Sequence, residues 1–280
     1  MREMGRLRGL TALIATLAAL AVPASASADY VALGDSYAAG PLIPLQIQPF
    51  GCLKSNNNYA HIAQRTLAFA EFRDPSCSGA ETEDMTQSQG VSPGPNPPQF
   101  DSLSADTELV TINIGGNDIG FSGIAEDCFS FERTGSPCRD RYVVDGRDEI
   151  SERIAATAPK VAAVLRGIAA RSPRARVLVV NYSAIFPHRG PGCWPQMPVA
   201  EGDVPWLRAK QVELNAMLAR QARARGARVV DVYAASRGHD ACAAPVVRWV
   251  EPLIPASVAA PVHPNLLGMR AMARLVAAAA

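Results

Sequence analysis

The chain has 280 residues, of which 48% are hydrophobic and 19% are charged, and its formal net charge at pH 7 is +1. Because neither sign of charge is in excess, the composition excludes a polyelectrolyte tail and a general nucleic-acid binder. The apolar content is enough to build a core, so disorder over most of the chain is excluded as well.

The first 28 residues have the pattern of a secretory signal peptide. A basic start with Arg2, Arg6 and Arg8 precedes an uncharged apolar run over residues 10–22, and Ala26-Ser27-Ala28 follows as a small-residue cleavage site. The alternative, a transmembrane anchor, needs about 20 apolar residues, which is more than this run contains, and no later segment is long and apolar enough. We therefore expect a secreted, extracellular protein with a signal peptide over residues 1–28 and one domain over residues 29–280.

The cysteines fit export to an oxidising compartment, where we expect them to form disulfides. They are Cys52, Cys77, Cys128, Cys138, Cys193 and Cys242. Many pairings are open to them, and the residue pattern by itself does not choose one. A metal site is not expected, because the sequence has no C-x-x-C pair and no two histidines have ligand spacing.

The mature part of the chain alternates between strand and helix patterns. Runs rich in β-branched residues predict buried strands at Tyr30–Leu33, Leu109–Ile114, Arg176–Asn181 and Arg228–Val232. Helical patterns cover Asn58–Ala70, Arg147–Arg171, Trp206–Arg225 and Leu266–Ala279. Such alternation favours one α/β domain with a parallel sheet covered on both faces. Three connections are unusually long for a compact domain, and such loops usually have a function or are held by links such as disulfides. They are Gln87–Asp106, Phe121–Gly146 and Ala184–Pro205.

Residues that can carry chemistry follow two of these strands, at the edge where ligands bind in open parallel sheets. Ser36, after the first strand, is either a nucleophile near a helix N-terminus or the cap of that helix, and the tetrapeptide around it does not decide. Asn117 follows Gly115 and Gly116 after the next strand. Its amide can stabilise an oxyanion, although a plain turn is the simpler interpretation of this segment by itself.

His263 is the histidine best placed to act as a base. Pro261 and Pro264 fix the backbone around it, and a neutral imidazole can take a proton from a serine hydroxyl near neutral pH. The other histidines, at positions 61, 188 and 239, are interpreted as packing or surface residues.

Four short blocks, taken in order, resemble the GDSL esterases and lipases, also called SGNH hydrolases. The blocks are Val31-Ala32-Leu33-Gly34-Asp35-Ser36-Tyr37, Cys77-Ser78-Gly79-Ala80, Ile114-Gly115-Gly116-Asn117-Asp118 and His263-Pro264-Asn265. The chain looks most similar to the secreted actinomycete (Streptomyces-type) branch. The resemblance implies a single-domain, three-layer α/β/α sandwich with a mostly parallel, flavodoxin-like central sheet.

Carried over by residue, the resemblance makes Ser36 the nucleophile and His263 the general base. It places the oxyanion hole at the backbone N–H groups of Ser36 and Gly79 and the side-chain amide of Asn117. It also implies the disulfides Cys52–Cys77, Cys128–Cys138 and Cys193–Cys242.

One position departs from the commonest family pattern. Many relatives carry an aspartate three residues before the histidine, where this chain has Ala260. We therefore expect a Ser–His dyad in which the main-chain oxygen of Ala260 orients the imidazole. The rival expectation is that Asp240 or Glu251 supplies the acid.

The expected function is a secreted carboxylic ester hydrolase that cleaves lipid or other acyl esters through an acyl-enzyme. The same site would serve a phospholipase or a carbohydrate acetylesterase, and the alternative from another class is a non-catalytic secreted binding protein. We expect no cofactor, no metal, no nucleic-acid partner, a monomer, and at most transient contact with a lipid surface. Apolar loop residues are candidates for an acyl groove, although core packing is the commoner role for each: Ile119, Phe121, Phe186, Trp194, Met197 and Trp249.

Overall fold

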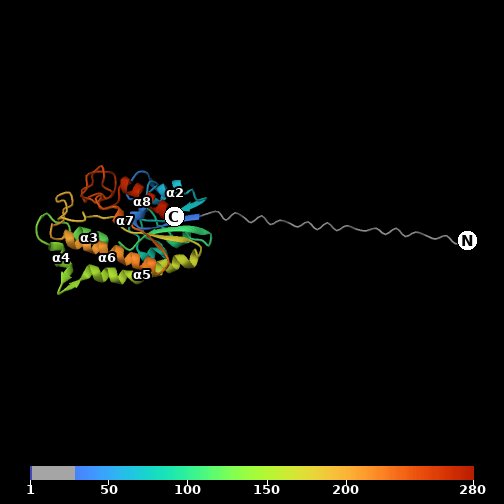
Figure 1. The fold of residues 1–280 in the computed structure, drawn as a ribbon, viewed down its shortest axis with the longest axis horizontal. Helices are drawn as coiled ribbons and strands as arrows, with labels where there is room; N and C mark the ends of the chain where they lie inside the picture. Colours follow the sequence, from blue (N-terminus) through green and yellow to red (C-terminus); the bar gives the residue numbers. More distant parts are fainter. Residues whose placement is uncertain (2–28) are drawn as a thin grey trace.

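The computed structural model describes Met1 and residues 29–280, so the predicted signal peptide lies outside the described residues except for its first residue. At the centre is a five-stranded sheet in the order β4-β1-β5-β8-β9, in which every pairing is parallel (Figure 1). Its strands are β1 (Asp29–Gly34), β4 (Glu71–Arg73), β5 (Thr107–Asn113), β8 (Arg176–Val180) and β9 (Arg228–Val230). From β1 the chain runs outward to β4 and then returns to β5 on the other side. The crevice between the ends of β1 and β5 is therefore the switch point where such sheets bind ligands.

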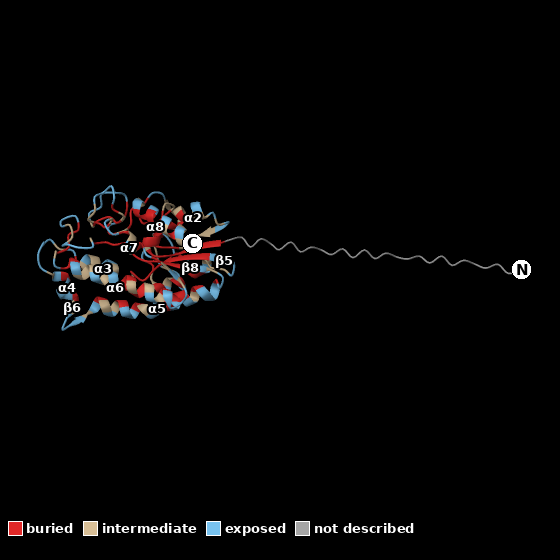
Figure 2. Cartoon of the chain, in the orientation of Figure 1, coloured by how far each residue is buried: buried red, intermediate tan, exposed pale blue. Residues whose placement is uncertain are grey.

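Four long helices cover the two faces of the sheet. One face carries α5 (Glu149–Arg171) and α6 (Val204–Arg223), and the other carries α2 (Tyr59–Leu67) and α8 (Leu266–Ala279). Successive strand side chains point to opposite faces, so Val31 and Leu33 pack with α5 and α6 while Tyr30 and Ala32 pack with α2 and α8. Figure 2 shows the result, with buried strands between helices whose outer surfaces are exposed.

The expected fold class is confirmed, and most predicted elements lie within a few residues of their places. The predicted terminal helix has the observed bounds, whereas α2 stops at Leu67 because Ala68 takes a left-handed conformation with φ 53°. Edge strand β4 was not predicted, because it has only three residues, two of them charged, and so shows almost no apolar pattern. Arg147, predicted as helical, belongs instead to a short hairpin strand before α5.

The remaining elements are short and line the connections. They are α1 (Ser36–Ala39), α3 (Phe121–Asp127), α4 (Pro137–Tyr142), α7 (Val232–Ala235), β2 (Gln46–Ile47), β3 (Lys54–Ser55), β6 (Val143–Val144), β7 (Arg147–Asp148), and the 3₁₀ turns η1 (Phe50–Cys52), η2 (Thr82–Met85) and η3 (Gln99–Ser102). Within the described part of the chain, none of the helices is long and apolar enough to cross a membrane.

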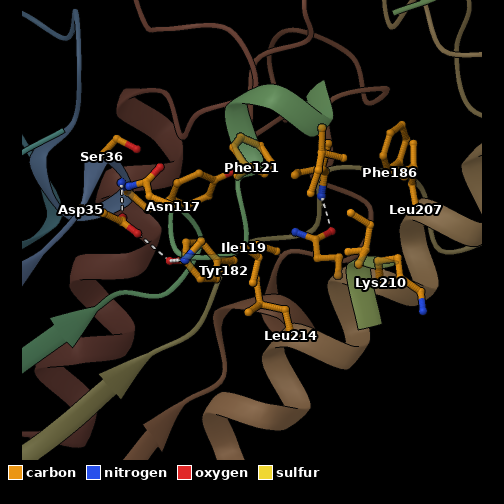
Figure 3. Close-up of a pocket in the computed structure, with 16 residues that line it drawn as sticks. Asp35, Ser36, Asn117, Ile119, Phe121, Tyr182, Phe186, Leu207, Lys210 and Leu214 are labelled. Carbon is orange, nitrogen blue, oxygen red and sulfur yellow. Dashed lines mark hydrogen bonds between the residues drawn. The ribbon is translucent and has the colours of Figure 1, made fainter. Parts of the chain in front are cut away.

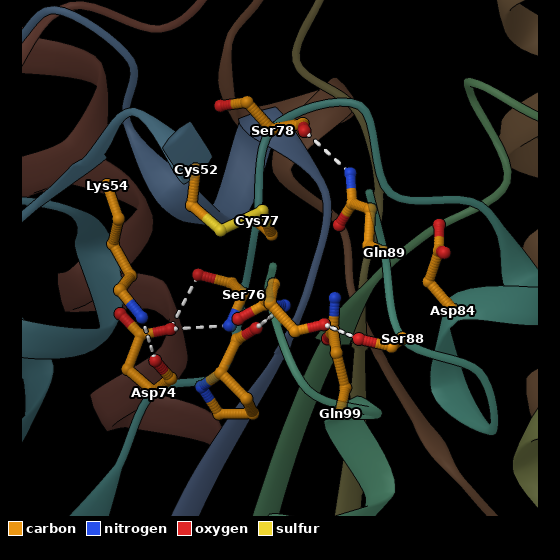
Figure 4. Close-up of a disulfide and its surroundings, with 12 residues drawn as sticks. Cys52, Lys54, Asp74, Ser76, Cys77, Ser78, Asp84, Ser88, Gln89 and Gln99 are labelled. Carbon is orange, nitrogen blue, oxygen red and sulfur yellow. Dashed lines mark hydrogen bonds between the residues drawn. A yellow bond between two sulfur atoms is a disulfide. The ribbon is translucent and has the colours of Figure 1, made fainter. Parts of the chain in front are cut away.

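The three disulfides are those that the family resemblance implies, and each pins a connection near the carboxyl edge of the sheet. Cys52–Cys77 fixes the turn that carries Gly79 (Figure 4), Cys128–Cys138 closes the segment from α3 to α4, and Cys193–Cys242 ties together two long loops. These loops lie outside the central sheet, and the covalent links restrict them further.

We expect the disulfide that closes the longest loop to stabilise the fold most. The bridge Cys193–Cys242 spans 49 residues and Cys128–Cys138 spans 10. Loop entropy then predicts that Cys193→Ser/Cys242→Ser lowers the free energy of unfolding by about 1 kcal/mol more than Cys128→Ser/Cys138→Ser does. Urea denaturation of the two double variants measures the difference. A larger loss from the shorter bridge would contradict this explanation.

Candidate active site

Ser36 stands at the first residue of α1, directly beyond the end of β1. Gly34 makes the turn possible: its φ is +146°, and a Cβ there would lie 2.6 Å from the carbonyl oxygen of Asn113 on β5. The Gln99 side chain bonds both the N–H and the carbonyl of Gly34, at 2.8 and 2.9 Å. The turn is therefore held from two sides, and Ser36 is brought to the switch point.

The structure resolves which residue caps α1. The side chain of Asp35 accepts the N–H of Tyr37 at 2.9 Å, so Asp35 is the N-cap. Ser36 is thereby released from the capping role that its sequence context also allowed. Its hydroxyl points instead toward the ring of His263.

The Ser36 Oγ lies 2.7 Å from Nε2 of His263, and Nδ1 of the same ring lies 2.7 Å from the carbonyl oxygen of Pro261. A carbonyl can only accept, so the proton sits on Nδ1 and Nε2 is free to accept from the serine hydroxyl. Burial lowers the pKa of His263 below its usual value, against the opposing effect of the Pro261 carbonyl. The imidazole is therefore neutral near pH 7 and has the tautomer that a general base needs.

The expectation that Ala260 orients the imidazole is wrong, because that contact is made by Pro261. The oxygen of Ala260 accepts the backbone N–H of His263 at 3.2 Å and is thus used inside a turn. Val262, at φ 60°, occupies the left-handed position of this turn, and the oxygen of Pro261 is left to meet the ring. The hydroxyl of Tyr37 donates to the Val262 carbonyl at 2.7 Å and holds the strained residue in place.

The two carboxylates considered as rivals have other partners. Glu251 accepts from the side chains of Asn265 at 2.7 Å and Ser257 at 2.6 Å, and Asp240 accepts the backbone N–H of Cys242 at 3.0 Å. Neither bonds to the imidazole of His263 among the contacts of the described residues.

Two hydrogen bonds tie the segment around Gly79, one of the expected oxyanion donors, to Gly34 and Asn117. The side-chain amide of Asn117 donates to the Ala80 carbonyl at 2.9 Å, and the N–H of Cys77 donates to the Gly34 carbonyl at 3.0 Å. These two bonds anchor the turn around Gly79, which adopts φ +82°, between the ends of β1 and β5. Within the described residues, the N–H groups of Ser36 and Gly79 have no protein acceptor.

A buried network that the sequence reasoning missed joins the ends of three strands. The carboxylate of Asp35, 2% exposed, accepts from the hydroxyl of Tyr182 at 2.5 Å, and that hydroxyl accepts the N–H of Gly116 at 2.7 Å. Burial raises the pKa of Asp35 to about 7, while the bonds from Tyr182 and Tyr37 favour the carboxylate. Tyr182 comes just after β8, so the rule that strand ends converge at one edge was the signal that could have found it.

An apolar pocket opens beside Ser36. Figure 3 shows Ser36 and Asn117 at one end of it and Phe186, Leu207 and Lys210 toward the other. Its lining residues are Asp35, Ser36, Tyr37, Gly116, Asn117, Ile119, Phe121, Ile124, Ile150, Tyr182, Ile185, Phe186, Leu207, Lys210, Gln211 and Leu214. Only the stem of Lys210 is available to it, because the Nζ is paired with Asp148 and Glu213 at 2.8 Å each.

Of the six apolar loop residues proposed for a groove, three line this pocket: Ile119, Phe121 and Phe186. Met197 lines a neighbouring cavity, and Trp249 stacks on His239 with ring centroids 4.4 Å apart. No group of three or more metal-binding side chains is placed to hold an ion within residues 29–280.

We expect Tyr182→Phe to destabilise the fold in a pH-dependent way. The change removes a donor to Asp35 and leaves the Gly116 N–H without its acceptor, which should cost about 1–3 kcal/mol of unfolding free energy. The bond stabilises the ionised form of Asp35, so the loss should be larger at pH 8.5 than at pH 5.5, on either side of the Asp35 pKa of about 7. Urea denaturation of the wild type and the variant at both pH values measures this loss of unfolding free energy.

The matched control is Tyr233→Phe, because the Tyr233 hydroxyl has no partner among the hydrogen bonds of the described residues. Equal losses from the two variants, or a loss from Tyr182→Phe that does not change with pH, would rule out the network as described.

Comparison with known proteins places this site in a family. The model of the GDSL-like lipase/acylhydrolase family matches residues 32–271. Lipase 2 of Streptomyces coelicolor is 42% identical over 92% of this chain and 88% of its own length, and a lipase of Streptomyces rimosus is 30% identical over 82% and 80%.

Solved structures agree on the fold. The extracellular lipase from Streptomyces rimosus superposes with a TM-score of 0.70 at 25% identity, covering 90% of this chain and all of that one. Phospholipase A1 from Streptomyces albidoflavus superposes with a TM-score of 0.75 at 24% identity, covering 90% of this chain and 98% of the other. With the family model and the 42% identical relative, the matches show that the chain belongs to the GDSL-like lipase/acylhydrolase family and is an ester hydrolase of the GDSL type.

Proposed function

We propose that this ester hydrolase is a secreted serine esterase or lipase that cleaves fatty-acyl esters with Ser36 as nucleophile and His263 as general base. The observation that carries the proposal is the 2.7 Å contact between Ser36 Oγ and His263 Nε2 at the mouth of an apolar pocket. A nucleophile paired with a correctly protonated base is the arrangement that acyl transfer requires. The same contact argues against a non-catalytic binding protein.

In the first step His263 Nε2 takes the proton of Ser36 as Oγ forms a bond to the ester carbonyl carbon. The carbonyl π electrons move to oxygen, and the resulting oxyanion collapses to break the bond to the alcohol oxygen. The alcohol leaves with the proton from His263, and the acyl group stays on Ser36. Water, deprotonated by His263, then attacks the acyl-enzyme and releases the carboxylic acid in the same way.

The oxyanion is proposed to bind the N–H groups of Ser36 and Gly79 and the amide of Asn117. The Asn117 amide has one hydrogen on the Ala80 carbonyl, which fixes its direction and leaves the second hydrogen for the substrate. Donors held in this way need no rearrangement when charge develops on the oxygen.

The Pro261 carbonyl takes the place that a carboxylate has in a Ser-His-Asp triad. It fixes the ring and the tautomer of His263, as a triad aspartate does. It is a dipole without net charge, so it stabilises the imidazolium less than a carboxylate would, and this agrees with the lowered pKa of His263.

The pocket supports an apolar acyl group as substrate. Its lining is mainly aliphatic and aromatic and is made by more side chains than an acetyl group could contact, which disfavours a carbohydrate acetylesterase. The names of the relatives, lipases from Streptomyces, support lipid esters. Phospholipid cleavage is the second candidate, and a panel of substrates decides between the two.

Secretion of the mature domain, residues 29–280, is part of the proposal. It is supported by the signal-peptide pattern and by three disulfides, which persist in oxidising surroundings.

We expect Ser36→Ala to abolish turnover of p-nitrophenyl esters and Asn117→Ala to lower kcat by about 10²–10³-fold, the usual cost of one oxyanion donor. Steady-state kinetics with acyl chains of increasing length measure both effects and define the chain-length preference. A triacylglycerol, a phosphatidylcholine and acetyl-xylan complete the panel. Full activity of Ser36→Ala, or no turnover of any ester by the wild type, would refute the proposal.

The pH dependence of kcat/KM identifies the base. Because His263 must be neutral to accept a proton and its pKa is lowered by burial, activity should persist below pH 6.5 and fall only at more acid pH. The profile of Tyr182→Phe separates this titration from that of Asp35, whose pKa the variant raises. An acid limb near pH 7 that moves upward in Tyr182→Phe would show that Asp35, rather than His263, controls the profile.

A further inference from the structure

Four large apolar side chains form an exposed patch on the loops around the site. They are Phe131, Ile254, Phe129 and Trp194, with exposed fractions of 84%, 61%, 44% and 37%. We call this set the Phe131 patch. The rings of Phe129 and Phe131 meet edge to face at 4.9 Å, so the two aromatic side chains stand together on the surface. Exposed apolar side chains that are grouped in this way often mark an interaction site, whereas single scattered ones do not.

Hydrogen bonds between three loops make the patch one surface. The N–H of Ser130 donates to the Pro198 carbonyl at 2.7 Å, the indole N–H of Trp194 donates to the Ser130 carbonyl at 3.4 Å, and the N–H of Ile254 donates to the Gln196 carbonyl at 3.4 Å. The disulfides at Cys128 and Cys193 hold the same loops. In Figure 1 the segment between α3 and α4, which carries Phe129 and Phe131, lies at the end of the domain away from the C-terminus.

A second cavity is lined by residues that are neighbours of the patch in the chain. Its lining is entirely apolar: Phe121, Ile124, Ala125, Cys128, Ile185, Phe186, Met197, Val199, Leu207, Leu253 and Val262. Cys128 and Leu253 are the chain neighbours of Phe129 and Ile254, and Met197 lies on the Trp194 loop. Five of the lining residues, Phe121, Ile124, Ile185, Phe186 and Leu207, also line the pocket beside Ser36. The two cavities therefore share one apolar wall, and residues adjacent in the chain to the patch line the second of them.

We propose that the Phe131 patch docks the enzyme on the surface of aggregated, uncharged or zwitterionic lipid, and that an acyl chain passes from there along the second cavity to Ser36. The inference rests on the proposed function. The apolar wall that the two cavities share favours a lipid layer, because an acyl chain held against this wall stays out of water. Acidic and basic residues nearly balance over α3, α4 and the segment that joins them, so the contact is apolar and not a charge attraction. The acidic residues are Glu126, Asp127, Glu132 and Asp140, and the basic residues are Arg133, Arg139 and Arg141.

The test compares Phe131→Ser and Phe129→Ser/Phe131→Ser with the matched control Phe50→Ser. Phe50 is 51% exposed and lies on η1, outside the patch. Binding to phosphatidylcholine vesicles is measured by sedimentation, and turnover is measured both on an emulsified long-chain ester and on p-nitrophenyl butyrate dissolved as monomers. Phe131→Ser should weaken vesicle binding about tenfold, in line with burial of one phenyl ring, and the double variant should weaken it further. Turnover of the emulsion should fall in parallel, while turnover of the dissolved ester stays within twofold for all variants.

Equal losses in Phe50→Ser, or vesicle binding that requires anionic lipid and disappears with salt, would overturn the assignment of this patch. Wild-type protein that sediments as a dimer, and that Phe131→Ser converts to a monomer, would show that a second copy covers the patch, which also overturns it. Failure of the proposed function gives a different result, since wild-type protein would then bind vesicles without hydrolysing the dissolved ester.

Discussion

The site depends on a constraint of parallel sheets, which is that neighbouring strands end at the same edge. Gly34 pairs with Asn113 at the ends of β1 and β5, and the chain leaves these two strands in opposite directions. The residues that follow, Ser36 and Asn117, must therefore face one crevice. A side chain at position 34 would close the approach of the two strands, since its Cβ would collide with the backbone of Asn113. The turn at Gly34 is thus what allows the residues after β1 and β5 to approach each other.

Around that turn the protein assigns separate tasks to adjacent polar groups. Asp35 caps α1 and binds Tyr182, so Ser36 is free to pair with His263. Tyr182 in turn accepts from Gly116, which links the serine turn to the asparagine turn through one hydroxyl group. A buried carboxylate without a cation is unfavourable, and burial accordingly raises the pKa of Asp35. The same hydrogen bonds join the residues that follow β1, β5 and β8 to one another.

Sequence reasoning predicted the architecture well, because long buried strands and amphipathic helices leave a clear periodicity. It also marked the serine, the asparagine and the histidine as candidates, since these follow strands or stand between prolines, but only the family resemblance assigned them catalytic roles. It missed the carbonyl of Pro261, because every residue has a carbonyl and only the turn decides which one faces the ring. It missed β4 for lack of an apolar pattern, and it could not foresee that Phe129 and Trp194 would share a surface, since loop packing has no period.

The central claim is that an acyl group is carried on Ser36 during turnover. The most direct measurement is mass spectrometry of enzyme quenched in acid within milliseconds of mixing with a p-nitrophenyl ester, followed by mapping of the modified peptide. The account predicts a mass increase equal to the acyl group, located on Ser36 and absent from the quenched Ser36→Ala variant. An acyl group found on another residue, or turnover with no acylated enzyme and direct transfer to water, would contradict it.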